Sequence, residues 1–136
     1  RVMTTEYVRL RQGLTVGEAL NKIRRSDEDK ETIYYAYVTD DNRKLVSVVS
    51  LRQLLFTIPD VLIREIASQR VVRVRTDTPQ AEAAQLMKRY DLIAIPVVDR
   101  EDRLVGIITV DDVVDILEEE ATADIQKLAG VSGGDE

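Results

Sequence analysis

The sequence contains no cysteine, no histidine and no tryptophan. Without cysteine, a disulfide framework and a thiolate metal site are excluded. Without histidine, the commonest general base, the usual zinc ligand and every Ser-His or Cys-His nucleophile pair are excluded. Carboxylates, lysine, tyrosine and the backbone are left for any chemistry. We therefore expect that the chain is not an enzyme and has no catalytic residues.

Long hydrophobic runs are missing as well. No apolar stretch approaches the roughly 18 residues that a membrane-spanning helix needs, and no signal peptide opens the chain. We therefore expect no membrane insertion by this chain itself. Because it begins at Arg1 and ends with GGDE, we expect it to be a part of a longer protein.

Charge is unevenly distributed along the 136 residues, whose formal net charge is −6. Residues 1–109 hold 18 Lys/Arg and 16 Asp/Glu, whereas residues 110–136 hold one lysine and nine acids. Binding to nucleic acid needs a basic stripe, and the basic residues here are scattered. Nucleic acid is therefore disfavoured as a partner. The hydrophobic content of 44% is enough to form a core.

A unit of about 60 residues occurs twice in the chain. Segments 36–55 and 95–114 align without gaps at an offset of 59, and segments 2–11 and 66–75 align at an offset of 64. Periodicity and turn residues predict the pattern β-α-β-β-α for each copy.

The predicted fold class is α+β, with the two units packed together as a pseudo-dimer. A strand over 7–10 opens the first unit, and its counterpart over 71–74 opens the second. The expected boundaries are residues 1–62 for the first unit, 63–130 for the second with a long acidic last helix, and 131–136 for a tail.

A hydroxyl residue precedes the last helix of each unit. Ser50 is followed three positions later by Gln53, and Thr109 is followed by Asp112, so both pairs fit a capping box that needs no ligand. The same geometry suits a phosphate, because a helix N-terminus presents free N–H groups. An aspartate on that first turn can accept both hydroxyls of a ribose. These residues alone leave the two interpretations open.

The helix predicted from Val110 to Ala129 carries a strip of carboxylates with no Lys or Arg among them. Like charges three or four positions apart on a helix repel by about 0.2–0.5 kcal/mol per pair. One interpretation is a solvated acidic face, and the other is a strip that Mg2+ completes, because hard oxygen ligands suit this ion better than zinc or copper. Carboxylates on one exposed face lack the dry pocket that acid-base catalysis needs. The strip consists of Asp111, Asp112, Asp115, Glu118, Glu119, Glu120 and Asp124.

The duplicated unit, with PVVDREDRLVGIITVDD in its second copy, resembles the CBS (cystathionine β-synthase) domain pair over almost the whole chain. The segments RVMTTEYVRL, ETIYYAYV, RYDLIAIPVVD and TVDDVVDILEEEATADIQKLAG resemble more narrowly the cytosolic region of MgtE-type magnesium channels. This resemblance implies a homodimeric regulatory domain at the cytoplasmic face of the membrane. It would sit between an N-terminal domain and a transmembrane pore of the same full-length chain, and would close the pore when intracellular magnesium is high.

The resemblance also assigns ligands to particular residues. For Mg2+ it marks Asp91, Asp112 and Asp115. Because Ala123 stands at a position that serves as a ligand in relatives, ligation there either shifts to Glu120 or Asp124 or is lost. Glu119 of the acidic strip completes the predicted magnesium set.

For ATP or another adenine nucleotide, the resemblance marks Tyr35, Arg52 and Pro96, with Thr109 and Asp112 in a second cleft. Two positions depart from the family pattern. Gln53 stands in place of a ribose-binding aspartate, and Leu92 in place of an aromatic stacking residue.

Two other functions stay open. One is an adenine-nucleotide-sensing CBS pair that regulates an enzyme or another transporter, which stabilisation by nucleotide but not by magnesium would favour. The other is a plain dimerisation module, which would respond to neither ligand.

Overall fold

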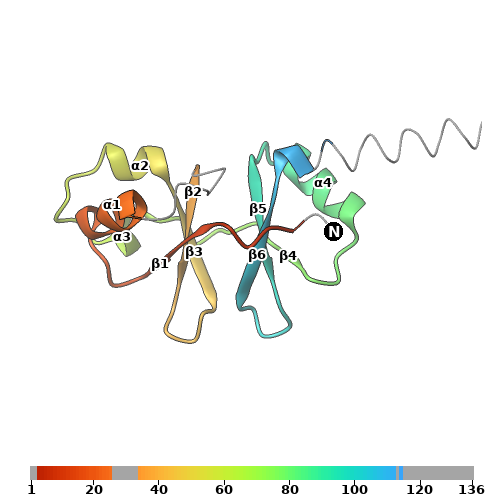
Figure 1. The fold of residues 1–136 in the computed structure, drawn as a ribbon, viewed down its shortest axis with the longest axis horizontal. Helices are drawn as coiled ribbons and strands as arrows, with labels where there is room; N and C mark the ends of the chain where they lie inside the picture. The colour runs from red at the N-terminus through yellow and green to blue at the C-terminus, as the bar shows by residue number, and fades with distance from the viewer. Residues whose placement is uncertain (1–2, 26–33, 113, 115–136) are drawn as a thin grey trace, which may run out of the picture.

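Two three-stranded sheets stand side by side in the computed structural model, which describes residues 3–25, 34–112 and 114 (Figure 1). In each sheet the first two strands are parallel and the last two antiparallel. The predicted tandem α+β units are thereby confirmed. The first sheet has the order β1 (Val8–Arg11), β2 (Tyr35–Thr39) and β3 (Leu45–Ser50), and the second has the order β4 (Val74–Arg75), β5 (Ala94–Val98) and β6 (Leu104–Thr109).

Helices lie on the outer sides of the two sheets (Figure 1). The first unit has α1 (Val16–Arg25), α2 (Leu51–Leu55) and α3 (Ile63–Ile66), and the second has α4 (Gln80–Arg89) and a helical turn that begins at residue 110. At the start of α1, the hydroxyl of Thr15 accepts a bond from the Glu18 N–H (3.1 Å), and the Glu18 carboxylate accepts one from the Thr15 N–H (2.8 Å). This reciprocal cap fixes where the helix begins. None of the helices in the described part of the chain is long and apolar enough to cross a membrane.

Two elements differ from the prediction. The helix α3 was not expected, and its first residue, Ile63, is fully buried in the core of the first unit although it follows the predicted boundary at residue 62. The strand β4 covers only Val74–Arg75 instead of residues 71–74. Val71 and Val72 are not part of the strand and line a cavity between the units.

The inner faces of the two sheets form a shared apolar core, which is the pseudo-dimer contact. Apart from this shared cluster, each unit has a cluster of its own under its helices. The shared cluster consists of Tyr37, Leu45, Ala94, Val98, Leu104 and Ile107.

Each sheet is extended by a segment that belongs to the other unit in sequence. Thr4 pairs antiparallel with Ile107 on β6, with N–H···O distances of 2.8 and 2.9 Å. Ser68 pairs in the same way with Val48 on β3, at 3.0 and 2.8 Å. Figure 1 shows the first segment crossing from the second unit to β1. The two units are therefore interlocked through backbone hydrogen bonds as well as through their core.

The β-hairpins of the two units also bond to each other, near their turns. The Leu45 N–H donates to the Asp102 carbonyl and the Leu104 N–H to the Arg43 carbonyl, both at 3.0 Å. The Arg73 guanidinium donates to both carboxylate oxygens of Asp102 (3.0 and 2.9 Å) and to the Leu45 carbonyl (3.3 Å). We call the contacts among Arg73, Asp102 and Leu45 the hairpin clamp.

Candidate functional site

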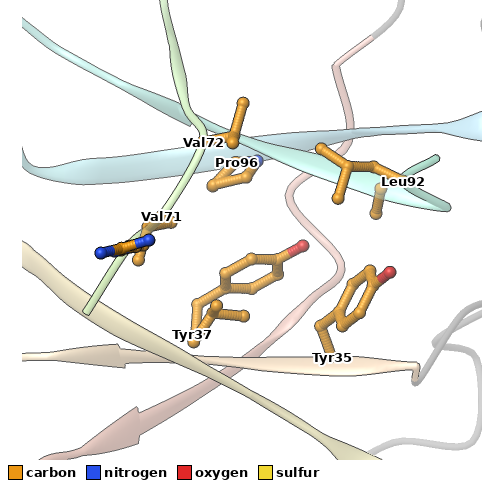
Figure 2. A pocket seen from close by; sticks show the side chains of 9 residues that line it. Tyr35, Tyr37, Val71, Val72, Leu92 and Pro96 are labelled. Atoms are coloured by element: carbon orange, nitrogen blue, oxygen red, sulfur yellow. The ribbon is translucent and has the colours of Figure 1, made fainter. Parts of the chain in front are cut away.

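A cavity of about 80 Å3 opens between the two units (Figure 2). Alternation along β2 places Tyr35 and Tyr37 on the same face of the first sheet, so both face the second unit. Pro96 on β5 lies on the opposite side of the cavity. The walls are mainly apolar and aromatic, and they consist of Tyr35, Tyr37, Val48, Arg70, Val71, Val72, Leu92, Ala94 and Pro96.

Tyr37 is the most enclosed of the cavity's polar side chains. Its side chain is 2% exposed, and its ring meets those of Tyr7 and Tyr35 edge to face with centroids 6.4 Å apart in both pairs. The hydroxyl has no hydrogen-bond partner among the described residues. Burial, followed by the nearby Tyr35, raises the pKa of Tyr37 far above its usual value, so the phenol stays protonated at neutral pH.

The structure brings together only some of the predicted nucleotide residues. Tyr35 and Pro96 line the cavity, and Leu92 lines it too. Arg52 does not line it; this exposed residue of α2 places its guanidinium carbon 5.8 Å from the ring centroid of Phe56. Sequence reasoning did not assign Tyr37 to the site, although its alternation with Tyr35 in β2 was a usable signal.

Gln53 has both ends of its side-chain amide engaged. Its Oε1 accepts from the Ser50 backbone N–H (2.9 Å), and the backbone N–H of Gln53 donates to the Ser50 hydroxyl (3.0 Å), which confirms the predicted capping box. Its Nε2 donates to the Ile66 carbonyl (3.1 Å) and so ties α3 to α2. Each end of this amide thus already has a partner in the protein, and the amide carries no charge with which to bind a ribose.

Thr109 and Asp112 form only half of the predicted capping box in the second unit, because the Asp112 carboxylate accepts from Thr109 but the Asp112 N–H donates no described bond to the Thr109 hydroxyl. The Thr109 hydroxyl is nearly buried and donates to Oδ2 of Asp112 (3.0 Å), and the Thr109 N–H donates to the same atom (3.3 Å). Among the described residues, Oδ1 of Asp112 accepts no hydrogen bond. Neither residue lines the cavity between the units.

Asp91, the remaining described candidate for Mg2+, follows α4 directly after its C-cap residue Tyr90. Its φ of 55° is the left-handed conformation common after a helix, and the next N–H, of Leu92, donates to the Met87 carbonyl (2.8 Å). Its side chain is exposed. Within residues 3–25, 34–112 and 114, no group of three or more acids is placed to hold a metal ion. The other predicted ligands, Asp115, Glu119, Glu120 and Asp124, lie outside the described residues and stay a prediction.

Comparisons with known proteins match this architecture. A family model for the CBS domain matches residues 1–60 and 63–119. The magnesium transporter MgtE of Thermus thermophilus is 55% identical over 130 residues, which cover 96% of this chain and 29% of the transporter. The chain thus spans less than a third of that relative.

Solved structures give the same picture. The cytosolic domain of the Mg2+ channel MgtE in complex with ATP superposes with a TM-score of 0.82 at 53% identity, covering 85% of this chain and 46% of that one. The soluble part of a magnesium transporter gives a TM-score of 0.86 at 42% identity, covering 88% and 47%.

Proposed function

Because the chain belongs to the CBS domain family, we propose that it is the cytosolic regulatory domain of an MgtE-type magnesium transporter and that it responds to intracellular Mg2+. The observation that carries this proposal is the 55% identity to an MgtE transporter across 96% of the chain. The similarity of the fold to the cytosolic domain of an MgtE channel supports it. Its place would be the cytoplasmic face of the membrane, next to the N-terminal and transmembrane domains of the same full-length chain.

The charge of the C-terminal residues, for which the sequence predicts a helix up to residue 129, supports a response to divalent cations. Residues 110–136 hold nine acids and one lysine, and Asp112 at the helix start keeps one carboxylate oxygen unbonded among the described residues. Mg2+ commonly keeps several waters and binds through one or two carboxylates. Such binding is weak and reversible, as a sensor of an abundant ion requires.

The proposed mechanism is electrostatic. At low Mg2+ concentration the acidic strips of neighbouring subunits repel, and the assembly opens. Hydrated Mg2+ neutralises the strips and holds a compact homodimer. The last helix passes this change to the transporter's pore.

A magnesium titration of the 136-residue chain tests this proposal, with melting temperature and dimer fraction as readouts. The variants are Asp112→Asn and Asp115→Asn. An asparagine at position 112 still offers an oxygen to Thr109, so this variant removes the charge and keeps the cap. We expect Mg2+ to raise both readouts in the wild type and to raise them less in the two variants.

Asp41→Asn is the matched control. It removes one negative charge from a side chain that is 90% exposed at a hairpin turn, so its magnesium response should equal that of the wild type. A wild-type chain whose melting temperature and dimer fraction ignore Mg2+ would contradict the proposal.

Binding of an adenine nucleotide is the second candidate function. The specific observation is the cavity that contains Tyr35 and Pro96, in a fold similar to a domain solved with ATP. Stabilisation by ATP in the absence of Mg2+ would support it. Stabilisation by ATP together with indifference to Mg2+ would favour a nucleotide-sensing CBS pair of an enzyme or another transporter.

A further inference from the structure

We propose that Tyr37 is a specificity-determining residue of the cavity between the two units. Its hydroxyl donates a hydrogen bond to an acceptor atom of a flat heterocyclic ring, so the ligand is selected by its ring and not by its ribose. This inference rests on the second candidate function, ligand binding in that cavity, and is independent of the response to Mg2+.

The first argument is the unpaired hydroxyl. Among the described residues, two buried side-chain polar atoms have no hydrogen-bond partner, the hydroxyl oxygens of Tyr37 and Thr39. Only Tyr37 lines the cavity. A buried donor without an acceptor costs free energy, and an acceptor that enters the cavity recovers that cost.

The second argument is the direction of the hydroxyl. Figure 2 shows the hydroxyls of Tyr37 and Tyr35 pointing the same way, toward the side of the cavity where Leu92 lies. Tyr37 thus belongs to the shared cluster between the units and not to the core of its own unit, and its buried hydroxyl lies at the wall of the cavity. Since the phenol stays protonated at neutral pH, it acts there as a donor.

The third argument is the shape and chemistry of the walls. Tyr35, Val71, Leu92 and Pro96 line the cavity with aromatic and aliphatic surface, which favours stacking and edge contacts with a flat ring. The volume of about 80 Å3 is well below the roughly 300–1,000 Å3 of a typical ligand site. A cavity of this size holds one part of a ligand, and its walls fit the ring part.

The fourth argument concerns the ribose. The position that the family uses for a ribose carboxylate is Gln53 here, whose amide is bonded to Ser50 and Ile66. Gln53 also does not line the cavity. The sugar of a nucleoside therefore meets no charged acceptor at this position. Selection among ligands then depends on the contact between the ring and Tyr37.

The experiment measures how strongly two ring compounds, adenine and indole, bind to the wild type and to Tyr37→Phe. Adenine carries acceptor nitrogens, and indole is a bicyclic ring of similar size without them. Binding of each to the wild type and to Tyr37→Phe is followed by calorimetry or ligand-observed NMR. We expect Tyr37→Phe to weaken adenine binding by about 3- to 10-fold, the ratio that corresponds to one neutral hydrogen bond, and to leave indole binding unchanged.

Two further readouts complete the test. The melting temperature of Tyr37→Phe without ligand should equal or exceed that of the wild type, because the substitution removes an unpaired buried hydroxyl. Adenosine should bind the wild type with nearly the affinity of adenine. A gain of about tenfold or more from the ribose, the ratio expected of a bond to a charged acceptor, would overturn the ring-selection part.

The outcomes separate this inference from the proposals it follows. Adenine binding that is equal in the two proteins, or an equal loss for adenine and indole, overturns the role of Tyr37 while ATP binding itself can persist. If neither adenine nor ATP binds the wild type, the second candidate function falls together with this inference. In either case the magnesium titration tests the proposed response to Mg2+ independently of these results.

Discussion

Removal of the hairpin clamp by Arg73→Ala should lower the free energy of unfolding by about 1–2 kcal/mol. The Arg73 guanidinium donates to both oxygens of Asp102 at 3.0 and 2.9 Å and to the Leu45 carbonyl at 3.3 Å. Hydrogen bonds to charged groups contribute about 1.5–3 kcal/mol, whereas exposed ion pairs contribute about 0–1 kcal/mol. The two side chains are 26% and 44% exposed, so the expected value lies between these ranges.

Urea denaturation measures this effect, as a shift of the midpoint at constant m-value. The matched control is Arg11→Ala, because Arg11 pairs with Asp41 at 3.4 Å while their side chains are 69% and 90% exposed. That variant should stay within about 0.5 kcal/mol of the wild type. If Arg73→Ala is no less stable than the control variant, the hairpin clamp contributes nothing and the reasoning is refuted.

Two further predictions concern the join between the units and one hairpin turn. Gly106→Ala should destabilise the fold by about 1–3 kcal/mol through overpacking, because a Cβ at Gly106 would collide with the side chain of Met3; an unchanged melting temperature would contradict this. Hydrogen bonds from the Arg103 N–H and other groups of the turn hold the pKa of Asp99 below its usual value, so Asp99 stabilises the fold above about pH 4 and this contribution is lost as the pH falls through the folded-state pKa. Acid unfolding of Asp99→Asn should therefore depend less steeply on pH below about pH 4, and curves of equal steepness would disprove the role of the turn.

Local patterns in the sequence were sufficient to predict the repeated β-α-β-β-α order. The capping box of Ser50 and Gln53 depends only on residues three positions apart, so it can be predicted without any knowledge of tertiary contacts. Contacts distant in sequence left no such signal. The bond from Gln53 to the Ile66 carbonyl joins two helices across 13 positions, and α3 has only four residues, which is too short for a helical period to be visible.

In the candidate site too, local sequence patterns predict some features, whereas others depend on tertiary packing. Alternation in β2 predicts that Tyr35 and Tyr37 lie on one face. The sequence does not predict that the Tyr37 hydroxyl has no described partner, because this depends on how the second unit packs against the first. Val71 and Val72 are typical strand residues, yet they form a wall of the cavity. The resemblance marks Arg52 as a nucleotide residue, and the structure places it on the exposed surface of α2, outside the residues that line that cavity.

The pairing of Thr4 with β6 and of Ser68 with β3 makes each half of the chain dependent on the other. A polypeptide that carried only one half would leave a sheet margin unpaired and open to strands of other molecules. Such a half-chain could pair this margin by forming a dimer in which a second copy supplies the missing segment. With both halves in one chain, that exchange becomes intramolecular, and its completion no longer depends on protein concentration.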